Sequence, residues 1–143
     1  MKADSSSLEQ DEKALISILN EMCKSMTGAQ STKEWANDAI WFDVAPFASR
    51  GIETALKQFD SAFSQLSSFV IDILRTDSFI NGDMAILCSV QKWSIVTKDG
   101  THIPPMLIRQ TNCFERRQVE WKVIHEHSSV PASQGWDGGI VGA

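Results

Sequence analysis

Four polar side chains have the types that a small-molecule site needs: Asp43, Arg109, His125 and His127. A carboxylate beside an imidazole can move protons, because burial and mutual pairing shift the pKa values of both groups. An arginine can hold a carboxylate or a phosphate through paired hydrogen bonds. These residue types indicate acid–base chemistry on a small ligand, provided that the elements carrying them bring them together.

The two histidines lie in a stretch that alternates as a β-strand does. Side chains two residues apart in a strand share a face. One set comprises Trp121, Val123, His125 and His127, and the other comprises Lys122, Ile124, Glu126 and Ser128. The second set carries the charges, so we expect it to face solvent. Both imidazoles would then face inward on an apolar surface beside a tryptophan.

Asp43 ends another predicted strand, residues 39–44, which is rich in aromatic and β-branched side chains. Trp41 and Asp43 share a face of it, so an inward orientation would bring the carboxylate to the two histidines. The alternative is structural: Asp43 caps the loop that contains Pro46, and the histidines form hydrogen bonds within the core. The residue pattern alone leaves both interpretations open.

The same side chains are a weaker match to a metal site. Two histidines with Asp43 or His102 form a known ligand set, but no flanking ligand motif accompanies the His-x-His spacing. We therefore predict no metal and no cofactor.

The elements that must position these residues are helices first and strands afterwards. The sequence predicts a helix from Ser6 to Gly28, a short one over residues 32–37 and one that begins after Gly51. Strands are predicted over residues 69–76, 85–97 and 107–114, followed by the histidine strand, with tight turns at Asn81-Gly82 and Asp99-Gly100. This order predicts a single α+β domain over residues 1–143, with helices on one face of an antiparallel sheet and a mobile glycine-rich tail at 132–143.

The last third of the chain resembles a known family. Arg109-x-Thr111, a short turn, Trp121 and then His125-Glu126-His127-x-Ser129-Val130-Pro131 resemble the SnoaL-like branch of the NTF2-like superfamily. The resemblance implies a cone whose curved sheet and helices enclose a cavity, and a homodimer built on the outer face of the sheet. It places Arg109 and Thr111 as ligand-binding residues inside that cavity, with Trp41, Trp93 and helix side chains such as Leu19 as walls. Ile108, Ile124 and Met106 are the apolar residues expected on the outer face.

Composition restricts the partners. The net charge of −5 argues against binding to nucleic acid or to anionic membranes. No apolar run approaches the roughly 20 residues of a membrane span, and the N-terminus has no signal-peptide core. The three cysteines are widely spaced in apolar surroundings, which is typical of reduced thiols in a cytoplasmic protein.

Two functions remain open. The first is a cofactor-independent isomerase, dehydratase or cyclase for a small apolar, ring-containing or acidic substrate, with Asp43, His125 and His127 as catalytic residues and Arg109 as the anchor. The second is a non-catalytic ligand-binding or dimerisation module like a kinase association domain. The chain contains no tyrosine, although ketosteroid isomerases and scytalone dehydratase of this superfamily use tyrosines. This absence favours the second function.

Overall fold

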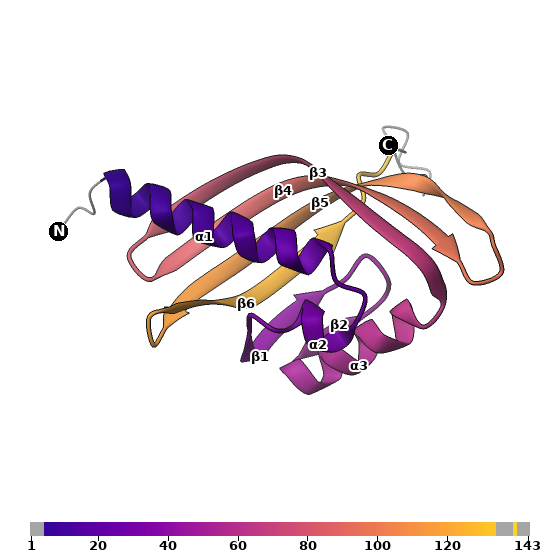
Figure 1. Ribbon diagram of the computed structural model, residues 1–143, viewed down its shortest axis with the longest axis horizontal. Helices are drawn as coiled ribbons and strands as arrows, with labels where there is room; N and C mark the ends of the chain where they lie inside the picture. The colour runs from indigo at the N-terminus through magenta and orange to yellow at the C-terminus, as the bar shows by residue number, and fades with distance from the viewer. Residues whose placement is uncertain (1–4, 134–138, 140–143) are drawn as a thin grey trace.

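The computed structural model describes residues 5–133 and 139, which form three helices and one six-stranded sheet (Figure 1). The helices are α1 (Ser5–Cys23), α2 (Gly28–Ser31) and α3 (Ile52–Phe63). The strands are β1 (Trp35–Phe42), β2 (Ala48–Arg50), β3 (Leu66–Asn81), β4 (Met84–Thr97), β5 (His102–Arg117) and β6 (Glu120–Ser129). Their order in the sheet is β2-β1-β6-β5-β4-β3, and all neighbours are antiparallel except β1 and β6.

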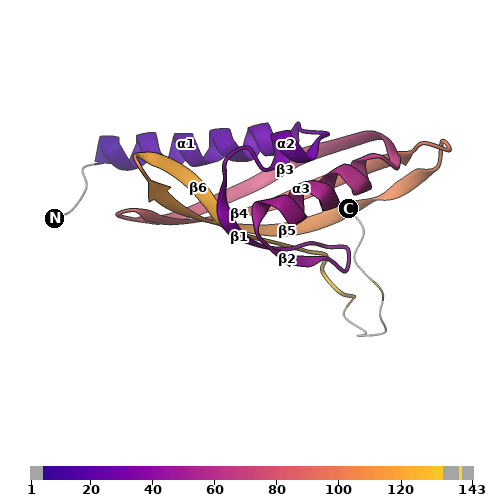
Figure 2. The same cartoon turned by 90° about the horizontal axis from the view of Figure 1, so that it is seen from below.

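The predicted fold class is confirmed: this is an α+β fold, with helices packed on one face of a largely antiparallel sheet. Figure 2 shows α1 lying along one face of the sheet. The apolar stripe of α1 buries Leu15 and Leu19 against Phe114 and Val123, and α3 adds Ala55 to the same core. The predicted antiparallel pairing of the Arg109 strand with the His125 strand is present as well.

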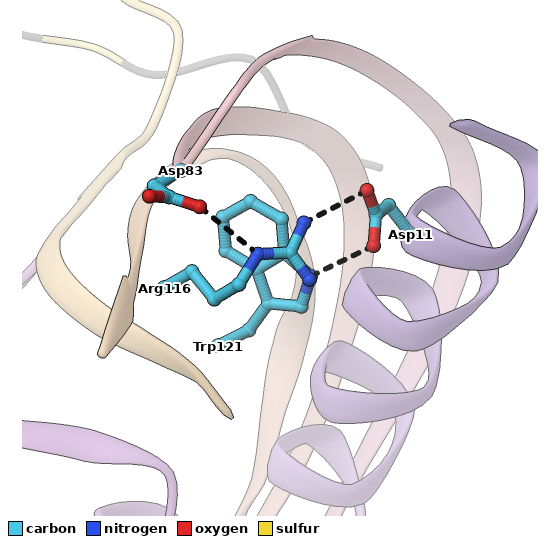
Figure 3. A network of polar contacts seen from close by, with 4 residues as sticks. All are labelled: Asp11, Asp83, Arg116 and Trp121. Carbon is cyan, nitrogen blue, oxygen red and sulfur yellow. Dashed lines mark hydrogen bonds and ion pairs between the residues drawn. The ribbon is translucent and has the colours of Figure 1, made fainter. Parts of the chain in front are cut away.

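A polar cluster fixes the N-terminal half of α1 to the sheet (Figure 3). The Nη2 of Arg116 donates to Asp11 Oδ2 at 2.9 Å, and its Nε donates to Asp83 Oδ1 at 3.2 Å. The guanidinium lies 4.2 Å from the ring centroid of Trp121, whose Nε1 donates to Asp11 Oδ1 at 3.4 Å. The cluster therefore ties α1 to both hairpins at this end of the sheet.

Two of the predicted helix boundaries are wrong. The first helix ends at Cys23, before Gly28, and residues 32–37 are not helical because β1 begins at Trp35. Gly28 begins α2 instead. A Cβ there would lie 2.2 Å from the backbone oxygen of Leu56, so a close approach of α2 to α3 requires this glycine.

A β-bulge in β6 reverses the faces predicted for that strand. Val123 pairs with Phe114 and His125 pairs with Cys113, so Ile124 is an extra residue without a partner on β5. Trp121 and Val123 face the core as expected, but beyond the bulge the inward residues are Glu126 and Ser128. The expectation that His125 and His127 face inward is therefore wrong.

Two further expectations were a mobile tail at the C-terminus and the absence of a membrane span. Most of the tail predicted over residues 132–143 lies outside the described residues. Within the described part, no helix is long and apolar enough to span a membrane.

Candidate functional site

A narrow cavity of about 60 Å³ lies between the helices and the inner face of the sheet. Aromatic side chains form a large part of its wall: Trp35, Trp41, Phe59, Phe63, Phe69 and Trp93 line it. These rings support one another, since Trp41 stacks on Phe59 at 4.2 Å and Phe69 meets Trp93 edge to face at 5.1 Å. The polar groups on the sheet side are Asp43, Gln110, Glu126 and Ser128. The cavity is thus mostly apolar, with these polar groups on the sheet side and Ser31 on the helix side.

Glu126 is the most unusual of these polar groups, because its carboxyl is buried without a cationic partner. The residue is 6% exposed, and no salt bridge among the described residues includes it. Burial raises its pKa to about 7; the Asn112 amide, which donates to Oε1 at 2.9 Å, opposes the rise, and the charge of Asp43 adds to it. Glu126 therefore exchanges its proton near neutral pH.

Asp43 lies directly after β1 and beside Glu126 across the parallel pair, in which Trp41 is opposite Glu126. Burial raises its pKa, and the hydrogen bond from the Val44 backbone N–H to Oδ1, 2.7 Å long, partly offsets that rise. Asp43 thus has both roles that the sequence left open, because it orders its own loop and also lines the cavity. The predicted shared inward face of Trp41 and Asp43 is confirmed.

Two buried polar atoms around Glu126 have no hydrogen-bond partner among the described residues. They are Nε1 of Trp41, a residue only 2% exposed, and Oδ1 of Asn112. The Trp41 indole nevertheless faces the Glu126 carboxyl and lowers its pKa as a hydrogen-bond donor does. Asn112 Oδ1 is then the unpaired atom beside this acid, and such buried unpaired atoms are rare in folded proteins.

The predicted site residues do not converge. His125 lies on the outer face, where its Nδ1 is 2.9 Å from the Ile40 carbonyl oxygen, and His127 is exposed beside Phe42. Arg109 is exposed on the same outer face, and Thr111 pairs across the strands with His127.

Of the residues predicted to line the cavity, Asp43, Trp41 and Trp93 do so, whereas the two histidines, the arginine and the threonine do not. No salt bridge among the described residues includes Arg109. Helix α1 contributes Met22 and Cys23 to the cavity rather than Leu19, which lies in the core.

Sequence reasoning missed Glu126, Ser128 and Gln110. The one available signal was Ile124, an apolar residue placed among the charged set of the alternation. An apolar residue directly after inward Val123 breaks a strict period of two and is compatible with a bulge. Among the described residues, no group of three or more His, Cys, Asp or Glu side chains is placed to hold a metal ion.

The family model of the SnoaL-like domain matches residues 13–133, so the chain belongs to the SnoaL-like family. Comparison with curated proteins gives no match. An NTF2-like protein of unknown function from Pseudomonas putida KT2440 has a similar structure, with a TM-score of 0.78, 16% identity and 96% of each chain covered.

Two other solved structures are similar to this chain, and they are described by two different functions. One is a type 2 hexachlorocyclohexane dehydrochlorinase, with a TM-score of 0.78, 14% identity and 87% of this chain and 88% of that chain covered. The other, from Xanthomonas campestris, is named as a candidate calcium/calmodulin-dependent protein kinase II association domain, with a TM-score of 0.69, 18% identity and coverage of 83% and 84%. Likeness at these identities shows the fold alone.

Proposed function

We propose that the protein binds a small neutral organic molecule in this cavity and catalyses cofactor-independent proton transfer on it, as an isomerase or a lyase. The observation that carries the proposal is the pair of carboxyl groups, Glu126 and Asp43, in a cavity with aromatic walls and no cationic side chain among the described residues that line it. Burial raises the pKa of both groups, and that of Glu126 to about 7, so the pair can exchange protons with a ligand near neutral pH.

The two carboxyl groups take different roles in this proposal. Glu126 has a pKa of about 7, so it holds its proton near neutral pH and is the general acid. Burial raises the pKa of both carboxyl groups, and because Asp43 is the less buried of the two, we assign it as the general base. Its charge in turn helps to keep the proton on Glu126, because two neighbouring carboxylates repel each other.

The size and charge of the cavity narrow the substrate class. An apolar cavity of about 150 Å³ can hold benzene, whereas this one measures about 60 Å³. It fits a molecule of about four non-hydrogen atoms, and a ring compound fits only if side chains such as Phe63 and Phe69 move. An organic acid is disfavoured, because the cavity is lined by two carboxyl groups and the expected anchor Arg109 is on the outer face.

Exchange of carbon-bound hydrogen for deuterium tests this proposal without knowledge of the natural substrate. Small aldehydes, ketones and hydroxyketones are incubated with the protein in D₂O, and NMR follows loss of the proton next to the carbonyl. We expect exchange with at least one compound, and a loss of at least 100-fold in Asp43→Asn and Glu126→Gln. Exchange that is equal in the parent and in both variants would contradict the assigned roles.

A non-catalytic module is the second candidate, and one observation favours it. The outer face of the sheet exposes Phe79, Met84 and Ile86, with exposed fractions of 73%, 46% and 42%. Such a patch suits assembly with a second chain. A parent protein that dimerises but catalyses no exchange with any compound of the panel would favour this function over the enzymatic one.

A further inference from the structure

A chain of hydrogen bonds crosses the inner face of the sheet and ends at the cavity. Trp93 Nε1 donates to Gln91 Oε1 at 2.7 Å, and Gln91 Nε2 donates to Ser89 Oγ at 2.8 Å and to Gln110 Oε1 at 3.2 Å. Gln110 Nε2 then donates to Ser128 Oγ at 2.9 Å. Apart from Trp93, which is partly buried, all members are at most 8% exposed, so water does not compete freely for these bonds.

Trp93 fixes the direction of the whole chain. An indole N–H can only donate, so Gln91 must present its oxygen to Trp93 and its amide nitrogen to its other neighbours. Gln110 must therefore present its oxygen to Gln91 and its nitrogen to Ser128. Reversing either amide would place two donors, or two acceptors, against each other inside the protein.

The consequence falls on the hydroxyl of Ser128. Its oxygen has to accept from Gln110, so its proton is free to donate elsewhere. Among the residues that the structure describes, no acceptor takes that proton, although Ser128 is only 3% exposed and lines the cavity. Ser128 shares the inner face of β6 with Glu126, and its neighbour His127 pairs with Phe42, the residue before Asp43.

We infer that Ser128 is a pre-oriented hydrogen-bond donor that holds an oxygen atom of the ligand within reach of Asp43 and Glu126. The buried Trp41 N–H also borders the cavity, but it faces the Glu126 carboxyl and lowers the pKa of that group, so Ser128 is the donor left for a ligand. An unused donor beside two acids selects a neutral ligand with an accepting oxygen, namely a small carbonyl compound or alcohol. A donor to a carbonyl oxygen also stabilises the negative charge that develops when the neighbouring carbon loses a proton.

This inference rests on the proposed function for the cavity as the binding site, but its test reads binding rather than turnover. The probe is acetone labelled with ¹³C at its carbonyl, since a hydrogen bond to the oxygen moves the carbonyl resonance downfield. Free acetone in water already accepts hydrogen bonds, so the resonance of bound acetone, obtained from the titration, is compared between the parent and the variants. Acetone bound to Ser128→Ala is expected to resonate upfield of acetone bound to the parent and to bind roughly tenfold more weakly.

Two further variants test the chain of hydrogen bonds, and of these only Ser89→Ala leaves the cavity wall intact, since Trp93 lines the cavity. Ser89→Ala also removes an acceptor of the glutamine chain, but Ser89 does not line the cavity, so the acetone shift should remain as in the parent. Trp93→Phe keeps Ser128 and removes the donor that sets the direction of the chain. The hydroxyl can then turn toward Gln110, and the shift should fall. Amide NMR spectra of each variant report whether it folds.

The outcomes separate the two proposals. No binding of acetone to the parent, or the same bound resonance in Ser128→Ala as in the parent, would overturn the donor role. A shift that depends on Ser128, in a protein that catalyses no hydrogen exchange, would support the donor role and contradict proton transfer. Exchange that persists unchanged in Ser128→Ala would contradict the donor role and leave the proposed function standing.

Discussion

Glu126 determines the electrostatics of the cavity, because its carboxyl is buried, is hydrogen-bonded by the Asn112 amide rather than by a cation among the described residues, and faces a second acid. A glutamate in an unfolded chain has a pKa near 4.5, and folding raises that of Glu126 to about 7. Between these two pKa values, the folded protein keeps the proton of Glu126, whereas the unfolded chain has released it. The contribution of this group to stability is therefore largest at low pH and is lost as the pH rises toward the folded pKa.

The first prediction concerns Glu126→Gln and the pH dependence of stability. The free energy of unfolding of the parent should fall as the pH rises from about 4.5 to about 7, by up to roughly 3 kcal/mol, and should change little through this group above that range. The variant should lose most of this fall and be the more stable protein at pH 8. Urea denaturation at pH 5 and pH 8 measures both, with exposed Glu9→Gln as the control that keeps the parental slope. An unchanged slope in Glu126→Gln would contradict the burial argument.

The second prediction concerns His125, which the sequence pattern assigned to the cavity. His125→Ala should leave ligand binding and hydrogen exchange unchanged, because the ring lies on the outer face. It should destabilise the protein by about 1 kcal/mol, since the Ile40 carbonyl loses its contact with the imidazole. Thermal melts and the exchange assay measure the two effects. A loss of exchange in this variant that approaches the loss in Asp43→Asn would restore the histidine to the site.

At the scale of elements, the turns and most of the helices and strands could be predicted, whereas the bulge could not. Asn81-Gly82 and Asp99-Gly100 marked the hairpins, and their glycines have φ values of +60° and +86°. A single extra residue at Ile124 decided which side chains enter the cavity. Strand periodicity predicts which side chains face the cavity only while the alternation of period two is unbroken. The faces of Asp43 and Trp41 were therefore predicted correctly, and that of His125 was not.

The third prediction concerns the contact between α2 and α3 at Gly28. A glycine-to-alanine change inside a helix normally stabilises it. Gly28→Ala should instead destabilise the protein by about 2 kcal/mol, because the new methyl group would meet the Leu56 carbonyl and the Gly28 N–H would lose its 2.6 Å bond to Asp60 Oδ1. Thermal melts check this. Gly82→Asn is the control and should be nearly neutral, since nothing lies near that glycine and asparagine tolerates its positive φ.

At the scale of the whole molecule, the two faces of the sheet differ in the side chains that they carry and in how far these are exposed. The inner face carries the core and the cavity, and the outer face carries Phe79, Met84 and Ile86 together with His125. Ile108, expected on the outer face, is fully buried on the inner face. The resemblance implied a dimer through the outer face, and this exposed apolar surface supports that proposal.

The fourth prediction is that two copies of the chain associate through this outer face. The parent should sediment as a dimer at micromolar concentration, and Ile86→Lys should sediment as a monomer, because it places a charge in the apolar surface. Val119→Lys removes an exposed apolar side chain from the turn between β5 and β6 and should leave the dimer intact. A monomeric parent would contradict the proposal.

The pKa of Glu126 in the folded protein tests the central claim most directly. The side-chain carboxyl resonance of Glu126, labelled with ¹³C and assigned by its loss in Glu126→Gln, is followed by NMR from pH 3 to pH 9. The expected midpoint is about 7, and it should fall in Asp43→Asn, where the neighbouring negative charge is removed. A midpoint near 4.5 that Asp43→Asn leaves unchanged would show that Glu126 is an ordinary solvated carboxylate, and would contradict an acid–base site in this cavity.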